Sequence, residues 1–112
     1  MVAAETGIVQ TAGRRVLDEL LQERGLQPGA YALFFVVGEG TFFELPQTKE
    51  IVETMSGSVL DASGHVFSFW MEWDAQRRQP ILSEWAQVEP EPFWATAPEY
   101  QRARRRLGLS TA

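Results

Sequence analysis

The stretch that decides the fold is residues 55–74, which reads MSGSVLDASGHVFSFWMEWD. At its centre, Asp61 can accept hydrogen bonds from the amides of a tight turn, and Gly64 can take the positive φ that this turn needs. We therefore predict a β-hairpin with a three-residue loop and a glycine bulge. In this hairpin Asp61 faces His65, and the register places Val59 opposite Phe67.

Side chains should alternate along the second strand of the hairpin, because successive residues of a strand point to opposite faces. The apolar face, which we expect to meet the core, consists of Phe67, Phe69, Met71 and Trp73. The outer face consists of Ser68, Trp70, Glu72 and Asp74. One face is thus apolar, and the other is polar but carries a tryptophan.

A polar run follows and returns the chain into residues 81–88, which completes a predicted three-strand meander. Two registers compete for this last strand. The first pairs Asp74 with Ile81 and makes Trp70 and Trp85 neighbours on the outer face, and a slip by one residue would bury Trp85 instead. We prefer the first because it turns three apolar residues toward the core: Leu82, Ala86 and Val88.

Before the hairpin, the apolar spacing from residue 8 to residue 24 predicts an amphipathic helix that ends at Gly25. Gly13 inside it indicates either a frayed first turn or a close packing contact. Residues 30–37 predict a central strand, followed by a glycine turn and a hairpin with residues 41–45. Residues 47–55 fit either a helix or a strand, and we favour the strand.

After the meander, alternating glutamates and prolines at residues 89–92 predict an extended connector. We expect Phe93 and Trp94 to hold the chain against the body. The spacing of Thr96 and Glu99 is typical of a capping box, and it predicts a short final helix that ends near Leu107.

These elements predict an α+β fold for a single domain, residues 1–112. An N-terminal helix packs on a four- or five-stranded antiparallel sheet, a hairpin plus a meander, with a short C-terminal helix at an edge or over the second face. The order of elements is similar to that of cystatin-like folds, a resemblance that implies architecture and carries no function.

Composition excludes several chemistries. The chain has 112 residues with no cysteine and one histidine, so disulfides, thiolate metal sites, cysteine nucleophiles and multi-histidine sites cannot form. Asp61, Ser63 and His65 share one exposed turn, which offers no pocket for a catalytic triad. We expect no cofactor, no metal, no membrane span and a cytoplasmic location.

Charge is unevenly distributed. Residues 16–100 hold 14 of the 15 acidic residues and four of the ten basic ones, a balance of −10, whereas the net charge is −5. The C-terminal segment carries four arginines, Arg102, Arg104, Arg105 and Arg106. An acidic body repels phosphate backbones and attracts basic proteins, so we expect no nucleic-acid partner.

The candidate binding residues are aromatic and acidic side chains on the outer face of the sheet. They are Trp70, Trp85, Glu72, Asp74, Phe42 and Phe43. Large aromatics there need cover, which the C-terminal segment, a second copy or another partner could supply. Glu84 is expected on the core side opposite Met71, where it would pair with an arginine unless it is a perturbed acid.

Two functions remain open. The first is a non-catalytic interaction module, inhibitor-like or immunity-like, that binds a basic protein and forms a homodimer through the outer face. The alternative is a cone-shaped domain, like that of cystatin-like folds, that binds a small ligand or uses Glu72 or Glu84 for catalysis beside the two tryptophans.

Overall fold

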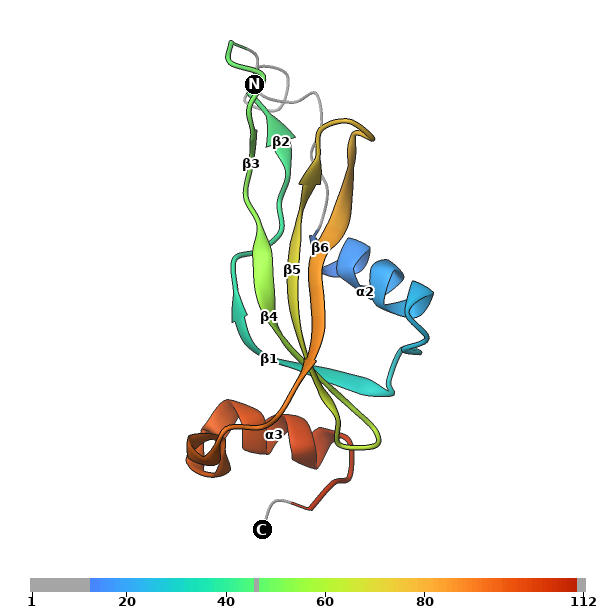
Figure 1. The fold of residues 1–112 in the computed structure, drawn as a ribbon, viewed down its shortest axis with the longest axis vertical. Helices are drawn as coiled ribbons and strands as arrows, with labels where there is room; N and C mark the ends of the chain where they lie inside the picture. Colours follow the sequence, from blue (N-terminus) through green and yellow to red (C-terminus); the bar gives the residue numbers. More distant parts are fainter. Residues whose placement is uncertain (1–12, 46, 111–112) are drawn as a thin grey trace.

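The computed structural model describes residues 13–45 and 47–110, and it shows the predicted α+β fold. Helices and strands follow one another as α2 (Gly13–Glu23), β1 (Tyr31–Val37), β2 (Phe43–Glu44), β3 (Ile51–Val52), β4 (Met55–Asp61), β5 (Val66–Asp74), β6 (Gln79–Val88), the 3-10 helix η1 (Pro92–Thr96) and α3 (Pro98–Arg106). Figure 1 shows the strands along the length of the molecule, α2 at their side and α3 at one end.

The main sheet has four antiparallel strands in the order β1-β4-β5-β6. The β4–β5 hairpin has the predicted register, in which Val59 pairs with Phe67, Gly57 with Phe69, and Met55 with Met71. Its turn is also as predicted, because the Asp61 carboxylate accepts hydrogen bonds from the amides of Ser63 and His65, both at 2.9 Å.

The predicted hairpin between residues 30–37 and 41–45 is wrong, because β1 pairs with β4. Gly57 permits this pairing, since a Cβ atom there would come within 3.0 Å of the Val36 Cα atom. The segment from residue 41 instead forms a separate two-stranded ladder of β2 with β3. Residues 51–52 are therefore a strand, as favoured.

The preferred register of β6 is wrong as well. The structure pairs Phe69 with Trp85 and Met71 with Leu82, with a shift between them that leaves Ser83 as an extra residue in β6. Such a β-bulge lets both Trp85 and Leu82 face the core, which no regular register allows.

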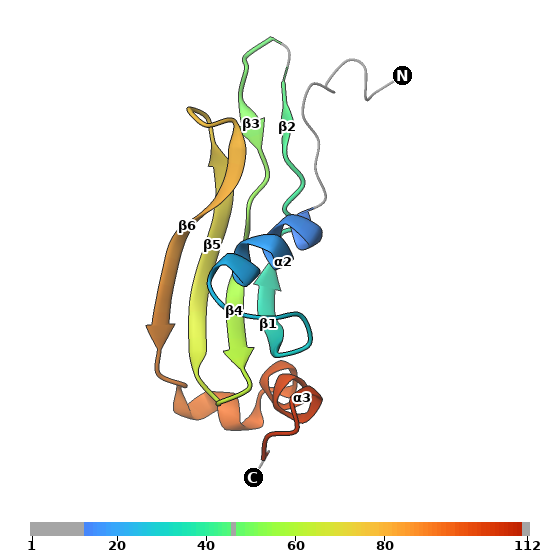
Figure 2. The same cartoon turned by 90° about the vertical axis from the view of Figure 1, so that its right-hand side faces the viewer.

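Helix α2 covers one face of the sheet, which we call the α2 face (Figure 2). Its buried Leu17 and Leu21 pack with Val59, Phe69 and Met71 in the main core. The described part of the helix starts at Gly13, and the predicted turn before it lies outside the described residues. Gly13 packs directly on the backbone of Gly40. Of the two explanations for this glycine, a frayed turn or a close packing contact, the structure shows the close contact.

Helix α3 and η1 cover the other face, which we call the outer face, at one end only. Trp94, Tyr100 and Ala103 pack on Leu60 and Val66 in a second core. The predicted final helix is confirmed, but its capping box does not form: Ala97 is the N-cap, without a side-chain bond. The Glu99 carboxylate instead accepts a hydrogen bond from the Phe35 amide at 3.0 Å.

Candidate functional site

Three rows of side chains cross the outer face, because residues paired on neighbouring strands point to the same side. The row nearest α3 is Ala32, Leu60, Val66 and Val88. The second row is Phe34, Ser58, Ser68 and Ala86. The third row, farthest from α3, is Val37, Ser56, Trp70 and Glu84. On β4 and β5, the apolar side chains of the first row thus give way to serines in the second, whereas Phe34 on β1 stays buried with Trp94 and Tyr100.

The cover over the outer face ends where this change occurs. Helix α3 and η1 bury Leu60 and Val66 in the first row. In the third row, Trp70 is 41% exposed and Val37 is 69% exposed. The C-terminal segment therefore covers part of the outer face and leaves Trp70 accessible. We call the uncovered part the open face: Val37, Ser56, Ser58, Ser68, Trp70, Glu84 and Ala86.

A hollow of about 380 Å³ lies at the boundary between the open face and the C-terminal segment. It is lined by Ser58, Ser68, Val88, Glu89, Glu91 and Trp94. The two serines contribute short polar side chains to its lining, and Trp94 contributes an aromatic ring. Carboxylates beside an aromatic ring favour a cationic side chain. Such a side chain can donate hydrogen bonds to the carboxylates and form a cation–π interaction with the ring.

The carboxylates around the open face carry uncompensated negative charge. Glu84 accepts a hydrogen bond from the Ser68 hydroxyl at 3.2 Å. The ion pairs of the described residues lie elsewhere: Arg14 with Asp18, His65 with Asp61, Arg77 with Asp74, and Arg78 with Glu44. Within that part of the chain, four carboxylates form no ion pair with a basic side chain: Glu72, Glu84, Glu89 and Glu91. They therefore attract a positively charged partner.

Three of the six candidate residues lie as expected relative to the outer face. Trp70 and Glu72 are on it, and Asp74 begins the turn at the end of β5. The Asp74 carboxylate accepts hydrogen bonds from the amides of Gln76 at 3.0 Å and Arg77 at 3.3 Å. Asp74 therefore shapes the β5–β6 turn.

The other three candidates are not on the open face. Trp85 lies on the α2 face, where it stacks on Phe67 with ring centroids 4.8 Å apart. Phe42 is fully buried, 6.0 Å from the Trp73 ring, and Phe43 is half-buried in the β2–β3 ladder. The predicted pair of Trp70 and Trp85 is thus split between the two faces by the β6 bulge.

Two contributors to the site, Glu84 and Trp94, differ from the expectation drawn from the sequence. Glu84 was expected opposite Met71 on the core side, but the bulge pairs it with Trp70 on the outer face. Trp94 was expected to hold the chain to the body, which it does, and it also forms the wall of the hollow. The stiff prolines at residues 90 and 92 were the available signal for this wall.

The described residues contain no group of three or more acidic or histidine side chains that could hold a metal ion. The side chain of His65 is exposed in its turn and lies 3.6 Å from the Asp61 carboxylate, which the turn amides also occupy. None of the helices in the described residues is long and apolar enough to cross a membrane. Comparisons with protein-family models, curated proteins and solved structures found no match for this chain.

Proposed function

We propose that this protein is a non-catalytic interaction module, inhibitor-like or immunity-like, that binds a basic segment of a partner protein on its open face. The observation that carries the proposal is the exposed Trp70 among carboxylates that no base neutralises in the described residues. Arginine and lysine side chains interact favourably with both groups.

The shape of the surface favours a protein partner over a small molecule. The open face extends across all four strands, from Val37 on β1 to Glu84 on β6, whereas the hollow beside Trp94 is confined to six residues at one end of it. An extended surface with an exposed aromatic residue is typical of a protein interface, where a few central aromatic residues contribute most of the affinity.

A second copy of this chain is a specific candidate for the basic partner. Arg102, Arg105 and Arg106 are exposed on α3, spaced so that they share one side of the helix. Within residues 13–45 and 47–110 these three arginines make no ion pair. A two-fold axis would bring the α3 arginines of each copy to the open face of the other. We also propose that the module acts in the cytoplasm.

The first experiment tests the charge of the open face. The probe is a fluorescein-labelled peptide of four arginine-alanine repeats, and the readout is fluorescence anisotropy. The triple variant Glu84→Gln, Glu89→Gln and Glu91→Gln should bind it roughly tenfold more weakly than the wild type, since each exposed carboxylate contributes about 0.5 kcal/mol. The matched control changes three exposed carboxylates elsewhere, Glu19→Gln, Glu23→Gln and Glu50→Gln. Equal loss in the two variants would refute the open face as the binding surface.

The second experiment tests the homodimer by sedimentation at micromolar concentration. Two variants should each be monomeric. The first reverses the charge of the open face (Glu84→Lys, Glu91→Lys), and the second reverses the charge of α3 (Arg102→Glu, Arg105→Glu, Arg106→Glu). A mixture of the two variants should dimerise again, because both contacts of the two-fold interface then join opposite charges. A monomeric wild type, or a mixture that stays monomeric, would rule out the second copy as the partner.

A further inference from the structure

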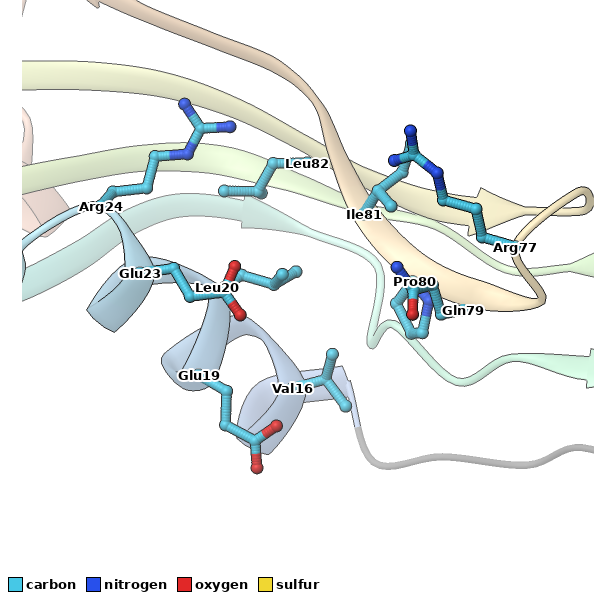
Figure 3. Close-up of a pocket in the computed structure, with 10 residues that line it drawn as sticks. All are labelled: Val16, Glu19, Leu20, Glu23, Arg24, Arg77, Gln79, Pro80, Ile81 and Leu82. Carbon is cyan, nitrogen blue, oxygen red and sulfur yellow. The ribbon is translucent and has the colours of Figure 1, made fainter.

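The hollows on the two sides of the main sheet differ in charge. The larger one, about 500 Å³, lies between α2 and β6 (Figure 3). Four charged residues line it: Glu19, Glu23, Arg24 and Arg77. Its two carboxylates balance its two arginines, which are already engaged by the Trp85 ring and by Asp74. The charged residues that line the hollow of the open face are Glu89 and Glu91, so this hollow selects for a cation.

A strip of short side chains crosses the open face over β4, β5 and β6. It is the second row of that face, Ser58, Ser68 and Ala86. Trp94 borders the strip on the side of η1, and the exposed Trp70 borders it on the other side. The rows on either side of the strip are four residues apart along each strand, about 14 Å. An α-helix with its side chains is about 10–12 Å wide, so it fits over the strip in contact with both tryptophans.

The two ends of the strip differ in polarity. At the β6 end, the Ser68 hydroxyl donates a hydrogen bond to the Glu84 carboxylate at 3.2 Å, which holds this carboxylate beside the strip. We call Glu84, Glu89 and Glu91 together the acidic end. Toward β1, the exposed side chains beside the strip are Trp70 and Val37. An occupant that lies across the strands therefore meets apolar side chains in one half and carboxylates in the other.

Two further charged residues lie close to the open face, and both have other partners. The Glu99 carboxylate accepts the hydrogen bond of the Phe35 amide at 3.0 Å. Arg104 lines an adjoining hollow with Glu91, but its guanidinium donates to the Tyr100 hydroxyl at 3.2 Å. Within residues 13–45 and 47–110, Arg104 forms no ion pair. The acidic end, with three carboxylates beside one arginine, therefore remains negative.

The conformation that suits an occupant of the strip is a helix. The backbone groups of β4 and β5 are used within the ladders of the sheet, so the open face offers no backbone partners to an extended chain. A helix makes its own backbone hydrogen bonds and keeps them when it leaves water. Helices also cover both faces of this sheet elsewhere: α2 and α3 both lie across the strands (Figure 1). A partner helix over the strip would complete that pattern.

From these features we infer that the open face binds an amphipathic α-helix of a partner protein, with apolar residues against Trp70 and Val37 and basic residues at the acidic end. This inference rests on the proposed function and adds two properties of the basic segment, its helical conformation and its apolar contact. From β4 to β6 the strip spans about 10 Å, which is about two helical turns. Helix α3 of a second copy offers arginines alone, because its apolar residues pack on its own body. A partner helix that supplies both kinds of residue should therefore displace a second copy.

The test uses the full chain and the synthetic peptide acetyl-Leu-Ala-Ala-Leu-Leu-Ala-Ala-Arg-Ala-Ala-Arg-Arg-amide. As a helix, this peptide carries its leucines and arginines on one face, in successive halves. NMR titration reports where it binds, and we expect the largest shifts at the amides of Ser58 and Ser68 and at the indole N–H of Trp70. The control is the diastereomer in which every alanine is the D enantiomer, which has the same charge but forms no right-handed helix. It should bind about tenfold more weakly, and only the first peptide should gain helical circular dichroism on binding.

A variant of the apolar contact gives a second, independent readout. Val37→Ser should weaken binding of the helical peptide about fivefold, since it removes an aliphatic side chain from the contact. It should not change the affinity for the arginine-alanine peptide, which has no large apolar residue to place there. Val37 is 69% exposed, and circular dichroism checks that the variant is folded. An equal loss for both peptides, or no loss for either, would refute the apolar contact.

Equal affinity for the helical peptide and its diastereomer, or shifts outside the open face, would overturn the inference. The proposed function would survive that result if the arginine-alanine peptide still required the acidic end, and it would fail together with the inference if no peptide bound. If the wild type sediments as a dimer, saturating helical peptide should convert it to a monomer. A dimer that persists would show that the helix and the second copy do not share the open face, which would also overturn the inference.

Discussion

Each face of the main sheet is lined by every second residue of its strands, but the two faces differ in how far apolar side chains continue along β5. On the α2 face, apolar side chains continue along β5 from Phe67 through Trp73, and the core continues with them. On the outer face of β5, Val66 is followed by Ser68, Trp70 and Glu72, and the cover by α3 ends after Val66. Side-chain size and polarity along one strand therefore mark how far a neighbouring element extends over it.

This difference indicates that the open face is adapted to water. Ser56, Ser58 and Ser68 lose nothing when they are solvated, whereas Val or Leu there would form a large apolar patch. Trp70 departs from that pattern, which is why we assign it to an interface. The two faces should consequently respond differently to mutation, and the following predictions test the difference in decreasing order of effect.

The largest effect is expected for adjacent residues of β5 that point to opposite faces. Phe69→Ala should lower the free energy of unfolding by about 3–5 kcal/mol, because it empties part of the main core. Trp70→Ala should lower it by less than about 1 kcal/mol, since this side chain is already partly in water. Urea denaturation measures both. Equal losses would mean that the open face is part of a core.

The contact between α2 and the loop before β2 should show the next largest effect. A Cβ atom at Gly13 would overlap the backbone of Gly40, which cannot rotate away as a side chain would. Gly13→Ala should therefore destabilise the protein by about 1–3 kcal/mol, despite the better helix propensity of alanine. Arg15→Ala, two residues later on the exposed side, is the control and should change stability by less than about 0.5 kcal/mol. A neutral Gly13→Ala would show that α2 can shift on the sheet.

Because of Tyr31, which lies in the core on the α2 face, the free energy of unfolding should depend on pH. Burial, then the hydrogen bond from its hydroxyl to the Asp18 carboxylate and the charge of that carboxylate, raise its pKa above the ordinary value of 10.0. Its stabilising contribution is complete below pH 10 and declines above it, because the unfolded chain then releases a proton that the folded protein retains.

Between about pH 10 and about pH 11, the free energy of unfolding should thus fall by at most about 1.4 kcal/mol per pH unit on account of Tyr31. Tyr31→Phe should lack this part of the decline in urea titrations at the two pH values. An identical decline in wild type and variant would show that Tyr31 ionises freely in the folded protein.

The smallest effect is expected where α3 is attached to β1. Glu99→Ala removes the acceptor of the Phe35 amide and should cost about 1 kcal/mol, whereas Glu99→Gln retains a side-chain oxygen and should cost less. Hydrogen exchange of the Phe35 amide measures the local effect directly. Unchanged protection in Glu99→Ala would mean that packing alone holds α3 on the outer face.

Local chemistry made the β4–β5 hairpin predictable. Asp61 and Gly64 determine its turn, and the turn determines the register of all the pairs that follow. α2 was predictable for the same reason, because its apolar spacing and Gly25, with a φ of 89°, are local features. Trp70 and Glu72 were consequently assigned to the correct face.

The features that were missed depend on contacts between distant segments. The bulge at Ser83 lets both Trp85 and Leu82 face the core. This burial stabilises the protein only when β5 and α2 are in place. A Cβ atom at Gly57 would crowd the backbone of β1 at Val36, a constraint that arises only once β1 pairs with β4. Half of the candidate site was therefore predictable. The residues of β5 were assigned to the correct face, whereas Glu84 and Trp85 on β6 were not.

The β2–β3 ladder also has a consequence for the order of folding. It lies within the connection between β1 and β4, which must close before the fourth strand can join the meander. Closure of a flexible loop becomes less unfavourable as the loop shortens, by about 0.6 kcal/mol for each halving of its length. When β2 pairs with β3, the connection behaves as a shorter chain, so the ladder should lower the entropic cost of bringing β1 to β4.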